Sequence, residues 1–407
     1  MKKENTVQLI RFGILALAAL AFRYYLAPQN GFPYDLKAFS FWASHGRLLN
    51  FFGFYSSRSL IKLSFPNYAL YFPILALLGP TADFATAAGR TLLKTPAIFG
   101  DIFLAGVVYF SAKPKWKFVA AAFILFNPAV WFDSTVYGQV DCFHAAFMAL
   151  AVLALADRKY RLSWIWLVIA LFFKVQAVAI FPLIAAVHFK GSGFKKMFLE
   201  IIPAAALAAL ISLPFILVSS WSGIWRSLRG SVGMFALVEI NAWNPWLLLH
   251  AVSGRYVSDA ETFYGVSYRN IGLVALALAV AAIICALPKR PGRAVLFAAA
   301  AAMYFSFFML STEMHERYLY PFLPMVAALL GESWVVASVA VIVSVVLFLN
   351  IDFVRIWSPV FEPFVRSGID CVFWSLALII IFAVFLIWYV HRAAREKQDE
   401  ASAITAK

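Results

Sequence analysis

The feature that most constrains this chain is a succession of apolar runs, most of them about as long as a membrane-spanning helix. The runs fall at 7–26, 93–112, 117–132, 142–156, 162–173, 175–189, 198–218, 271–287, 294–310, 319–331, 333–349 and 371–390. About 20 apolar helical residues cross a bilayer, and 63% of the 407 residues are hydrophobic while only 13% are charged. The pattern predicts an all-α polytopic membrane protein with about 12 transmembrane helices. No room is left for a soluble catalytic domain.

The first run is predicted to be a transmembrane helix that is retained. It follows Lys2 and Lys3, as the apolar part of a signal peptide would, but Arg11 and Arg23 interrupt it. A signal peptide has an unbroken apolar stretch and a small-residue cleavage site. This run has neither, so residues 7–26 count among the spans.

Short basic loops between the runs predict which helix ends face the cytoplasm. They lie at 113–117, 158–161, 190–196, 289–293 and 392–397. Because short loops rich in Lys and Arg stay on the cytoplasmic side, both termini are expected to be cytoplasmic. The formal charge of +14 then reflects topology, and no nucleic-acid partner is predicted. The segments expected outside are 27–92, 133–141, the vicinity of 174, 219–270, 311–318 and 351–370.

Two apolar stretches are predicted not to be simple spans. Residues 68–79 are too few to cross a bilayer comfortably, so we expect an interfacial helix there, in the first outer loop. Residues 162–189 contain one Lys and would form a helix of roughly 42 Å against a core of about 30 Å. Two short helices that meet near Lys174 at the outer face fit better.

Polar residues gather in the predicted outer segments, where they are candidates for chemistry. Asp35 lies in an amphipathic stretch that predicts a second short interfacial helix. The polar stretch that ends in Tyr137, Gln139 and Asp141 follows a helix-breaking proline and returns directly into an apolar helix, which favours a ligand site. Lys174 stands alone among apolar residues, where snorkelling to the surface is the alternative to a functional role.

The turn at 311–318 carries Glu313, His315, Glu316 and Arg317 between two apolar helices. This concentration of ionisable groups suits a charged ligand such as a phosphate, and a solvated turn is the alternative. Asp101 lies inside a predicted helix, where a carboxylate needs partners. It is a further candidate for the site or a structural acceptor for a neighbouring helix, and we favour the structural role.

Motifs for several other chemistries are absent from the sequence. There is no GxGxxG, Walker, HExxH or CxxC pattern, and Cys142, Cys285 and Cys371 are far apart. Nucleotide, zinc and redox chemistry therefore lose support. We predict no cofactor and no metal site, and leave open whether a divalent metal takes part.

These segments, in this order, resemble the GT-C glycosyltransferases, membrane enzymes that take a sugar from a polyprenyl-phosphate or dolichyl-phosphate carrier. The resemblance rests on Asp35, on Asn127–Pro128 with Tyr137–Asp141, on Lys174–Gln176 and on His315–Tyr318. The chain most resembles the bacterial branch of this superfamily, and it is more distantly similar to the dolichol-pathway glucosyltransferases and the GPI mannosyltransferase. It covers most of 1–330, taken as a catalytic membrane module with the outer loop 27–92. Residues 331–391 are expected to be C-terminal transmembrane helices, and 392–407 a cytoplasmic tail.

The resemblance implies transfer of a hexose such as mannose or glucose, inversion at the anomeric carbon, and a glycan, lipid or protein acceptor. It implies that Asp35 is the general base and that His315 and Arg317 hold the carrier phosphate. It also implies that the protein lies in the cell (inner) membrane, with its site on the periplasmic or extracellular face. Glycosyl transfer from a phosphate also requires, on chemical grounds alone, a carboxylate near the acceptor hydroxyl and cations near the departing phosphate. Asp35 lacks the neighbouring Asp of an Asp-x-Asp pattern, which argues against a metal.

Other readings of the same sequence stay open. A secondary transporter has a similar helix count, but it would place its binding residues near the midplane of repeated halves. A lipid-linked polysaccharide ligase or polymerase would use a pyrophosphate donor. A scaffolding membrane protein would have no use for Asp, Lys, His and Arg on one face.

Overall fold

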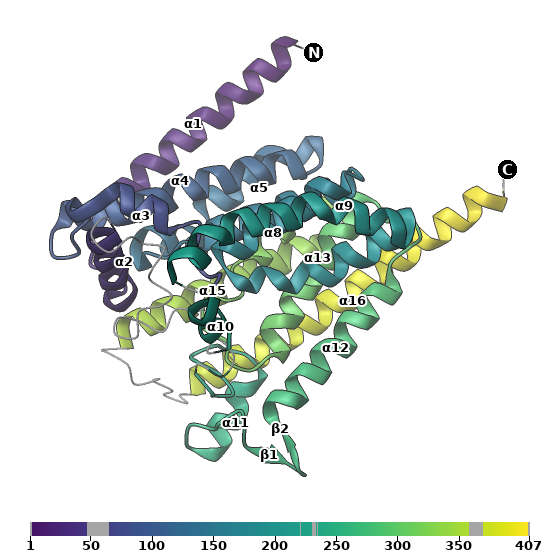
Figure 1. Ribbon diagram of the computed structural model, residues 1–407. Helices are drawn as coiled ribbons and strands as arrows, with labels where there is room; N and C mark the ends of the chain where they lie inside the picture. The colour runs from purple at the N-terminus through teal and green to yellow at the C-terminus, as the bar shows by residue number, and fades with distance from the viewer. Residues whose placement is uncertain are drawn as a thin grey trace.

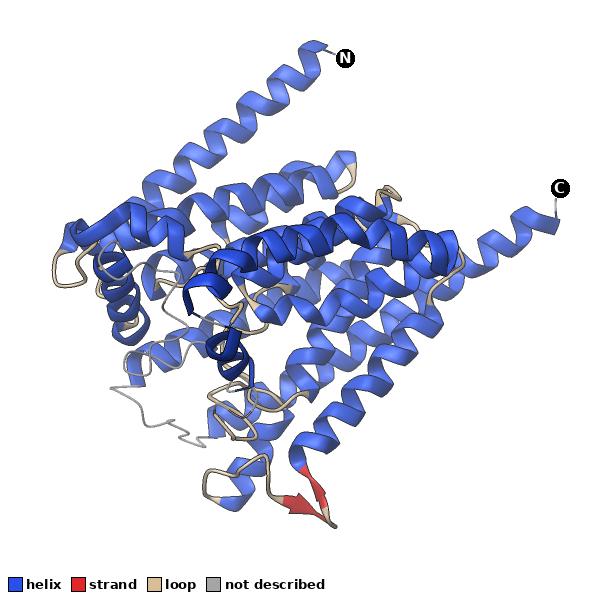
Figure 2. Cartoon of the chain, in the orientation of Figure 1, coloured by secondary structure: helices blue, strands red, loops and turns tan. Residues whose placement is uncertain are grey.

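The chain folds into a bundle of helices with one small hairpin of two strands, as the computed structural model shows for residues 2–46, 65–219, 221–229, 233, 235–357 and 369–405 (Figures 1 and 2). The α-helices are α1 (Lys2–Leu26), α2 (Pro33–Gly46), α3 (Phe72–Leu78), α4 (Ala87–Ser111), α5 (Lys117–Phe126), α6 (Pro128–Trp131), α7 (Asp141–Ala156), α8 (Tyr160–Phe173), α9 (Phe181–Ser219), α10 (Trp221–Arg229), α11 (Pro245–Ser253), α12 (Tyr268–Ala286), α13 (Arg293–Leu310), α14 (Phe322–Ala327), α15 (Trp334–Trp357) and α16 (Ile369–Thr405). Short 3-10 helices lie at Gly79–Thr81 (η2), Pro114–Trp116 (η3) and Val175–Ile180 (η5), a π-helix at Phe132–Tyr137 (η4), and the strands at Thr262–Phe263 (β1) and Val266–Ser267 (β2). Part of the outer loop predicted at 27–92, residues 47–64, and part of that at 351–370, residues 358–368, lie outside this description.

The predicted fold class, an all-α polytopic membrane protein, is confirmed. Each apolar run of the sequence contains helical structure, although in the run 319–331 only the six residues of α14 are α-helical. Seven helices of the described residues are long and apolar enough to cross a membrane, or eight if α5 and the bent continuation after it count as one span. The count is lower than the predicted twelve because some passes are short or are merged with a neighbour.

The short passes have a geometric cause. Helices α7 and α8 have 16 and 14 residues, which reach only roughly 24 and 21 Å at 1.5 Å per residue. The element α9 joins two apolar runs across Gly193, whose φ of 76° breaks the helix. The break predicted near Lys174 is confirmed, since α8 ends at Phe173 and Lys174 is extended, with φ −150° and ψ 131°.

Helix α13 lies at the centre of the bundle. Almost all its side chains are buried, including the run Ala298–Ala302. Small side chains allow neighbouring helix backbones to approach closely, and α13 packs against α7, α12, α14 and α16. The end of α13 at Leu310 therefore holds the turn at 311–318 in a fixed place beside α7.

The polar loops divide between the two ends of the bundle. At one end, ion pairs join Arg293 to Asp157 at 3.0 Å and Lys113 to Glu332 at 2.9 Å, so the basic loops lie together. Figure 1 shows both chain termini toward this end, and α2, α11 and the hairpin toward the other. The segments predicted outside meet at that other end, which agrees with their sorting onto one face.

Helix α1 is held to the bundle by a buried ion pair. Arg23 Nε donates to Asp101 Oδ2 at 2.9 Å, and both side chains are fully buried. Asp101 also accepts from Ser134 at 2.6 Å and from Tyr320 at 3.3 Å. Asp101 thus joins α1, η4 and the segment before α14 to α4, the structural role favoured above.

Candidate active site

The first turn of α2 places Asp35 against the end of the π-helix η4. One face of α2, formed by Leu36, Phe39, Trp42 and Ala43, is buried, and Phe32 stacks on Tyr137 with 4.7 Å between ring centroids. Gly138 has a φ of 97°, and a Cβ there would lie 2.6 Å from the Leu36 side chain. The close approach of these two segments fixes Asp35 beside the polar stretch that starts α7.

Gln139 connects Asp35 to Lys174. Its Nε2 donates to Asp35 Oδ2 at 2.5 Å, and its Oε1 accepts from Lys174 Nζ at 3.4 Å. Lys174 Nζ also makes a short ion pair with Asp141 Oδ1. Both residues of that pair are buried, which excludes the snorkelling alternative for Lys174. Because its backbone is extended between α8 and η5, Lys174 is free to point into this cluster rather than along a helix surface.

Arg317 brings the turn at 311–318 into the same cluster. Its Nη1 donates to Glu316 Oε1 at 2.6 Å, its Nη2 lies 3.7 Å from Asp35 Oδ2, and its Nε lies 3.8 Å from Asp141 Oδ2. Glu316 also accepts from the Tyr137 hydroxyl at 2.9 Å. The guanidinium carbon lies 5.7 Å from the centroid of the Tyr137 ring. One edge of the guanidinium, Nε with Nη2, therefore faces the two aspartates at ion-pair distance without hydrogen bonds to them.

The structure thus assembles seven of the ten candidate residues into one network, called here the Asp35–Arg317 cluster. Its members are Asp35, Tyr137, Gln139, Asp141, Lys174, Glu316 and Arg317. Asp35 keeps 16% of its side chain exposed and Arg317 keeps 10%. The cluster is therefore nearly closed to solvent, and Asp35, the candidate general base, is the more exposed of these two residues.

Burial controls the charge of the groups at the cluster's edge. Removal from water raises the pKa of the Asp35 carboxyl above its usual range, while Arg317 and the hydrogen bond from Gln139 lower it in part. Burial likewise lowers the pKa of His315 well below its usual value, and Arg317 and Lys174 lower it further. His315 is therefore an uncharged imidazole at neutral pH, and the positive charge of this turn resides on Arg317.

Asp101 and Glu313 lie apart from the cluster, and His315 lies at its edge, with Nδ1 3.8 Å from Glu316 Oε2. Asp101 belongs to the Arg23 ion pair. Glu313 pairs with Arg269 at 3.4 Å and accepts from the backbone of Gly233 at 3.0 Å, so it ties the turn to the outer loop. His315 packs against the rings of Phe235 and Tyr318, 4.8 and 4.9 Å away between centroids.

Tyr68 is a member of the site that sequence reasoning did not find. Its hydroxyl donates to Gln139 Oε1 at 3.4 Å, and Lys174 Nζ lies 5.8 Å from the centroid of its ring. Its backbone N–H donates to Phe173 O at 2.9 Å, which brings the turn before α3 against the break after α8. The apolar run that begins at Tyr68 carries no signal for this contact.

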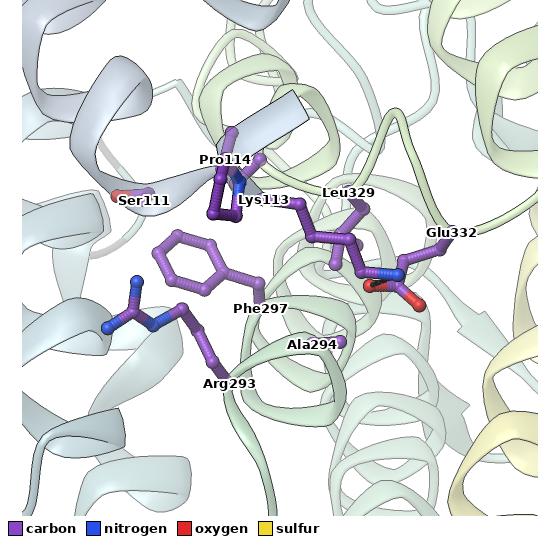
Figure 3. Close-up of a pocket in the computed structure, with 10 residues that line it drawn as sticks. Ser111, Lys113, Pro114, Arg293, Ala294, Phe297, Leu329 and Glu332 are labelled. Atoms are coloured by element: carbon purple, nitrogen blue, oxygen red, sulfur yellow. Dashed lines mark ion pairs between the residues drawn. The ribbon is translucent and has the colours of Figure 1, made fainter. Parts of the chain in front are cut away.

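Metal ligands and cavities outside the cluster do not provide a rival site. Within the described residues, no group of three or more His, Cys, Asp or Glu side chains could hold a metal ion. A cavity of about 190 Å³ lies at the basic end of the bundle, lined by Lys113, Arg293, Phe297 and Glu332 among others (Figure 3). Its charged groups are paired, Lys113 with Glu332 and Arg293 with Asp157, and none of them belongs to the Asp35–Arg317 cluster.

Comparison with known proteins supports the resemblance on part of the cluster. A family model described as "ALG3 protein" matches residues 139–229, a segment that includes Gln139, Asp141 and Lys174. A search of curated proteins found no match. The family match confirms the resemblance to the GT-C glycosyltransferases. The chain is thus similar to membrane glycosyltransferases that use a dolichyl-linked sugar.

Proposed function

We propose that this protein, as its similarity to the GT-C glycosyltransferases suggests, transfers a monosaccharide from a polyprenyl-phosphate carrier to an acceptor hydroxyl. The observation that carries the proposal is the meeting of Asp35 and Arg317, 3.7 Å apart between Oδ2 and Nη2. A base for the acceptor and a cation for the departing phosphate are the two groups that such a transfer requires. The sugar is a hexose, with mannose favoured by the family match.

Asp35 acts as the general base of an inverting transfer. The acceptor oxygen attacks the anomeric carbon on the side opposite the phosphate, and Asp35 takes the hydroxyl proton. The bond between the anomeric carbon and the phosphate oxygen breaks, and its electron pair leaves with the polyprenyl phosphate. Burial favours this role because it raises the pKa of the carboxyl, which makes it a stronger base than an exposed aspartate.

Arg317 binds the phosphate and stabilises its developing charge. Among the residues that the structure describes, Nε has no hydrogen-bond partner, and Nη2 lies 3.7 Å from Asp35 Oδ2, beyond hydrogen-bond distance. A planar fork of two N–H donors matches two phosphate oxygens. Lys174 adds a second positive charge, held in position by Asp141 and Gln139. Uncharged His315 is assigned a packing role in place of the cationic one implied by the resemblance.

A lipid carrier explains how the sugar reaches this end of the bundle. The basic loops lie at the opposite end, and short basic loops stay cytoplasmic, so the cluster belongs on the periplasmic or extracellular face of the cell membrane. Nucleotide sugars are cytoplasmic, whereas a lipid-linked sugar can be moved across the bilayer. The polyprenyl chain then lies among membrane lipids while its phosphate enters the cluster.

Cysteine labelling tests the proposed face. In a variant with the exposed Cys285 replaced by serine, a cysteine replaces either Tyr264, 92% exposed in the hairpin turn, or Lys159, whose side chain is 62% exposed at the basic end. A membrane-impermeant thiol reagent applied to intact cells should label the Tyr264→Cys variant only. Labelling of the Lys159→Cys variant alone would place the cluster in the cytoplasm and remove the argument for a lipid carrier.

Transfer from a defined donor tests the reaction itself. The purified protein in detergent is given synthetic polyprenyl-phosphate mannose or glucose, or the corresponding nucleotide sugars, with membrane glycolipids as acceptors and with or without a chelator. We expect release of polyprenyl phosphate from a lipid-linked donor, unaffected by the chelator. Transfer from nucleotide sugars alone would refute the proposal, and movement of the intact lipid or sugar without cleavage would favour a transporter.

A further inference from the structure

Several buried polar groups around Asp141 have no hydrogen-bond partner in the described structure. The atoms are both carboxylate oxygens of Asp133, Asp141 Oδ2, His144 Nδ1, the Tyr304 hydroxyl and Arg317 Nε. Buried polar groups are nearly always hydrogen-bonded, and each exception calls for an explanation such as a missing water or ligand. Their concentration in one neighbourhood points to a common cause.

Three of these residues, Asp133, His144 and Tyr304, were not among the candidates from sequence. Asp133 lies in the π-helix η4, and π-helical segments are frequent at functional sites. His144 lies on α7, one turn after Asp141, and Tyr304 on α13, which packs against α7. Their exposures are 0%, 1% and 0%. Each is more buried than Asp35, whose side chain is 16% exposed.

All three residues lie near Asp141. His144 Nδ1 lies 3.6 Å from Asp141 Oδ1, too far for a hydrogen bond. The charge of Asp141 acts on both Asp133 and Tyr304, which places all three groups within its electrostatic reach. Asp141 in turn pairs with Lys174 and faces Arg317, so the group continues directly from the proposed phosphate site.

We propose that Asp133, His144 and Tyr304 form a subsite that binds the sugar ring of the donor through its hydroxyl groups. This assignment rests on the proposed function. A carboxylate with two free oxygens accepts from two hydroxyls, a phenol both donates and accepts, and an imidazole nitrogen supplies a further contact. The ligand is an uncharged polyol because the charge of Asp141 would repel a second anion.

The neighbouring Asp101 carboxylate, in contrast, has a hydrogen-bond partner on each oxygen. Asp101 has hydrogen bonds from Arg23, Ser134 and Tyr320. Tyr320 and Tyr304 are both fully buried tyrosines, but within the described part of the chain only the Tyr320 hydroxyl has a partner. The two tyrosines therefore provide a matched pair: Tyr304→Phe removes an unpaired hydroxyl, and Tyr320→Phe removes one that supports the fold.

Thermal unfolding of the purified full-length protein, alone and with two lipids, tests the assignment. The probes are polyprenyl phosphate and polyprenyl phosphate carrying mannose or glucose. For the parent we expect stabilisation by the bare lipid and a larger stabilisation by a sugar-bearing one, since a ligand that binds the folded state raises its stability. Tyr304→Phe should keep or raise the unfolding temperature of the free protein, because the hydroxyl that it removes is unsatisfied. Asp133→Asn should leave that temperature nearly unchanged, because it exchanges one unsatisfied oxygen for an amide group of the same size.

Bare polyprenyl phosphate should stabilise both variants as it stabilises the parent, but the additional stabilisation due to the sugar should be lost. Their affinity for the sugar-bearing lipid should be about 3- to 10-fold weaker per lost hydrogen bond. Tyr320→Phe should lower the unfolding temperature of the free protein and retain the increment.

The outcomes separate this subsite from the proposed reaction. An unchanged sugar increment in Tyr304→Phe and Asp133→Asn would overturn the subsite and assign the empty hydrogen bonds to water. Equal stabilisation of the parent by both lipids would also overturn it while leaving the phosphate site intact. A parent that responds to neither lipid would refute the donor, and the subsite with it. If Asp133→Asn does not fold, Tyr304→Phe decides alone.

Discussion

The Asp35 carboxylate lies 3.7 Å from the Arg317 guanidinium, between Oδ2 and Nη2, although one belongs to α2 and the other to the turn between α13 and α14. The distance is short enough for the charge of Arg317 to act on the carboxylate and too long for a hydrogen bond. In the free protein, the cation proposed for the phosphate thus helps to keep the proposed base ionised. The two roles are coupled through one ion pair.

Replacing Asp35 with asparagine should nearly abolish transfer. Asparagine preserves the shape of the side chain but cannot take a proton, and loss of a positioned general base typically costs about 10²- to 10⁴-fold in rate. Turnover by the purified variant is compared with its binding of polyprenyl phosphate, which should be preserved. Turnover within a few-fold of the parent would shift the role of base to Asp141.

Replacing Arg317 with lysine should impair transfer even though the charge is kept. An ammonium cannot present two parallel N–H donors to a phosphate. The substitution also removes the guanidinium that donates to Glu316. We expect a loss of about 10-fold or more in kcat/KM for the lipid-linked donor, in line with two weakened charged hydrogen bonds. Arg269→Lys is the control, because Arg269 pairs with Asp259 and Glu313 outside the cluster and should leave donor affinity unchanged.

The pH dependence of transfer should report the environment of Asp35. The base works when deprotonated, so the rate rises with pH through the pKa of this carboxyl. Because burial raises that pKa, the acid limb should lie above the value of about 4 for an ordinary aspartate. Gln139→Leu removes a hydrogen bond that lowers the pKa, so the limb should move to higher pH. If the acid limb of the rate profile lies near pH 4 and does not move in Gln139→Leu, another group is the base.

Breaking the pair between Arg23 and Asp101 should destabilise the fold. Asp101→Ala leaves a fully buried arginine without its counter-ion, and loss of one partner of a buried pair typically costs about 3–5 kcal/mol. A large fall in the unfolding temperature is expected, measured in detergent beside Lys113→Ala, which removes a pair whose lysine side chain is 54% exposed. Similar small losses in both variants would argue that Arg23 finds other partners.

The sequence predicts the fold and part of the site because those features depend on the composition of short, continuous segments. Apolar runs identify the passes, and the isolated Lys174 marks the break between α8 and η5. Pairings between distant residues are not local. Arg23 interrupts an apolar run in the same way as Arg11, and nothing in the sequence distinguishes the one that pairs with Asp101.

Residues buried inside helices escape sequence reasoning for a related reason. His144 and Tyr304 lie within apolar helices, where a single polar side chain is usually a satisfied core residue. Only their unmet hydrogen bonds, which depend on the packing of α7 against α13, set them apart. The uncharged state of His315 is also not predicted, because its burial could not be foreseen from the three ionisable residues beside it, Glu313, Glu316 and Arg317.

A structure of the protein with a non-cleavable polyprenyl-phosphate sugar analogue is the most direct test of the account. The predicted result places the phosphate within hydrogen-bond distance of Arg317 Nε and Nη2, the anomeric carbon facing Asp35, and the sugar hydroxyls against Asp133 and Tyr304. A phosphate bound instead at the basic end, in the cavity between Lys113 and Arg293, would contradict the assignment of the site and of the face on which it works.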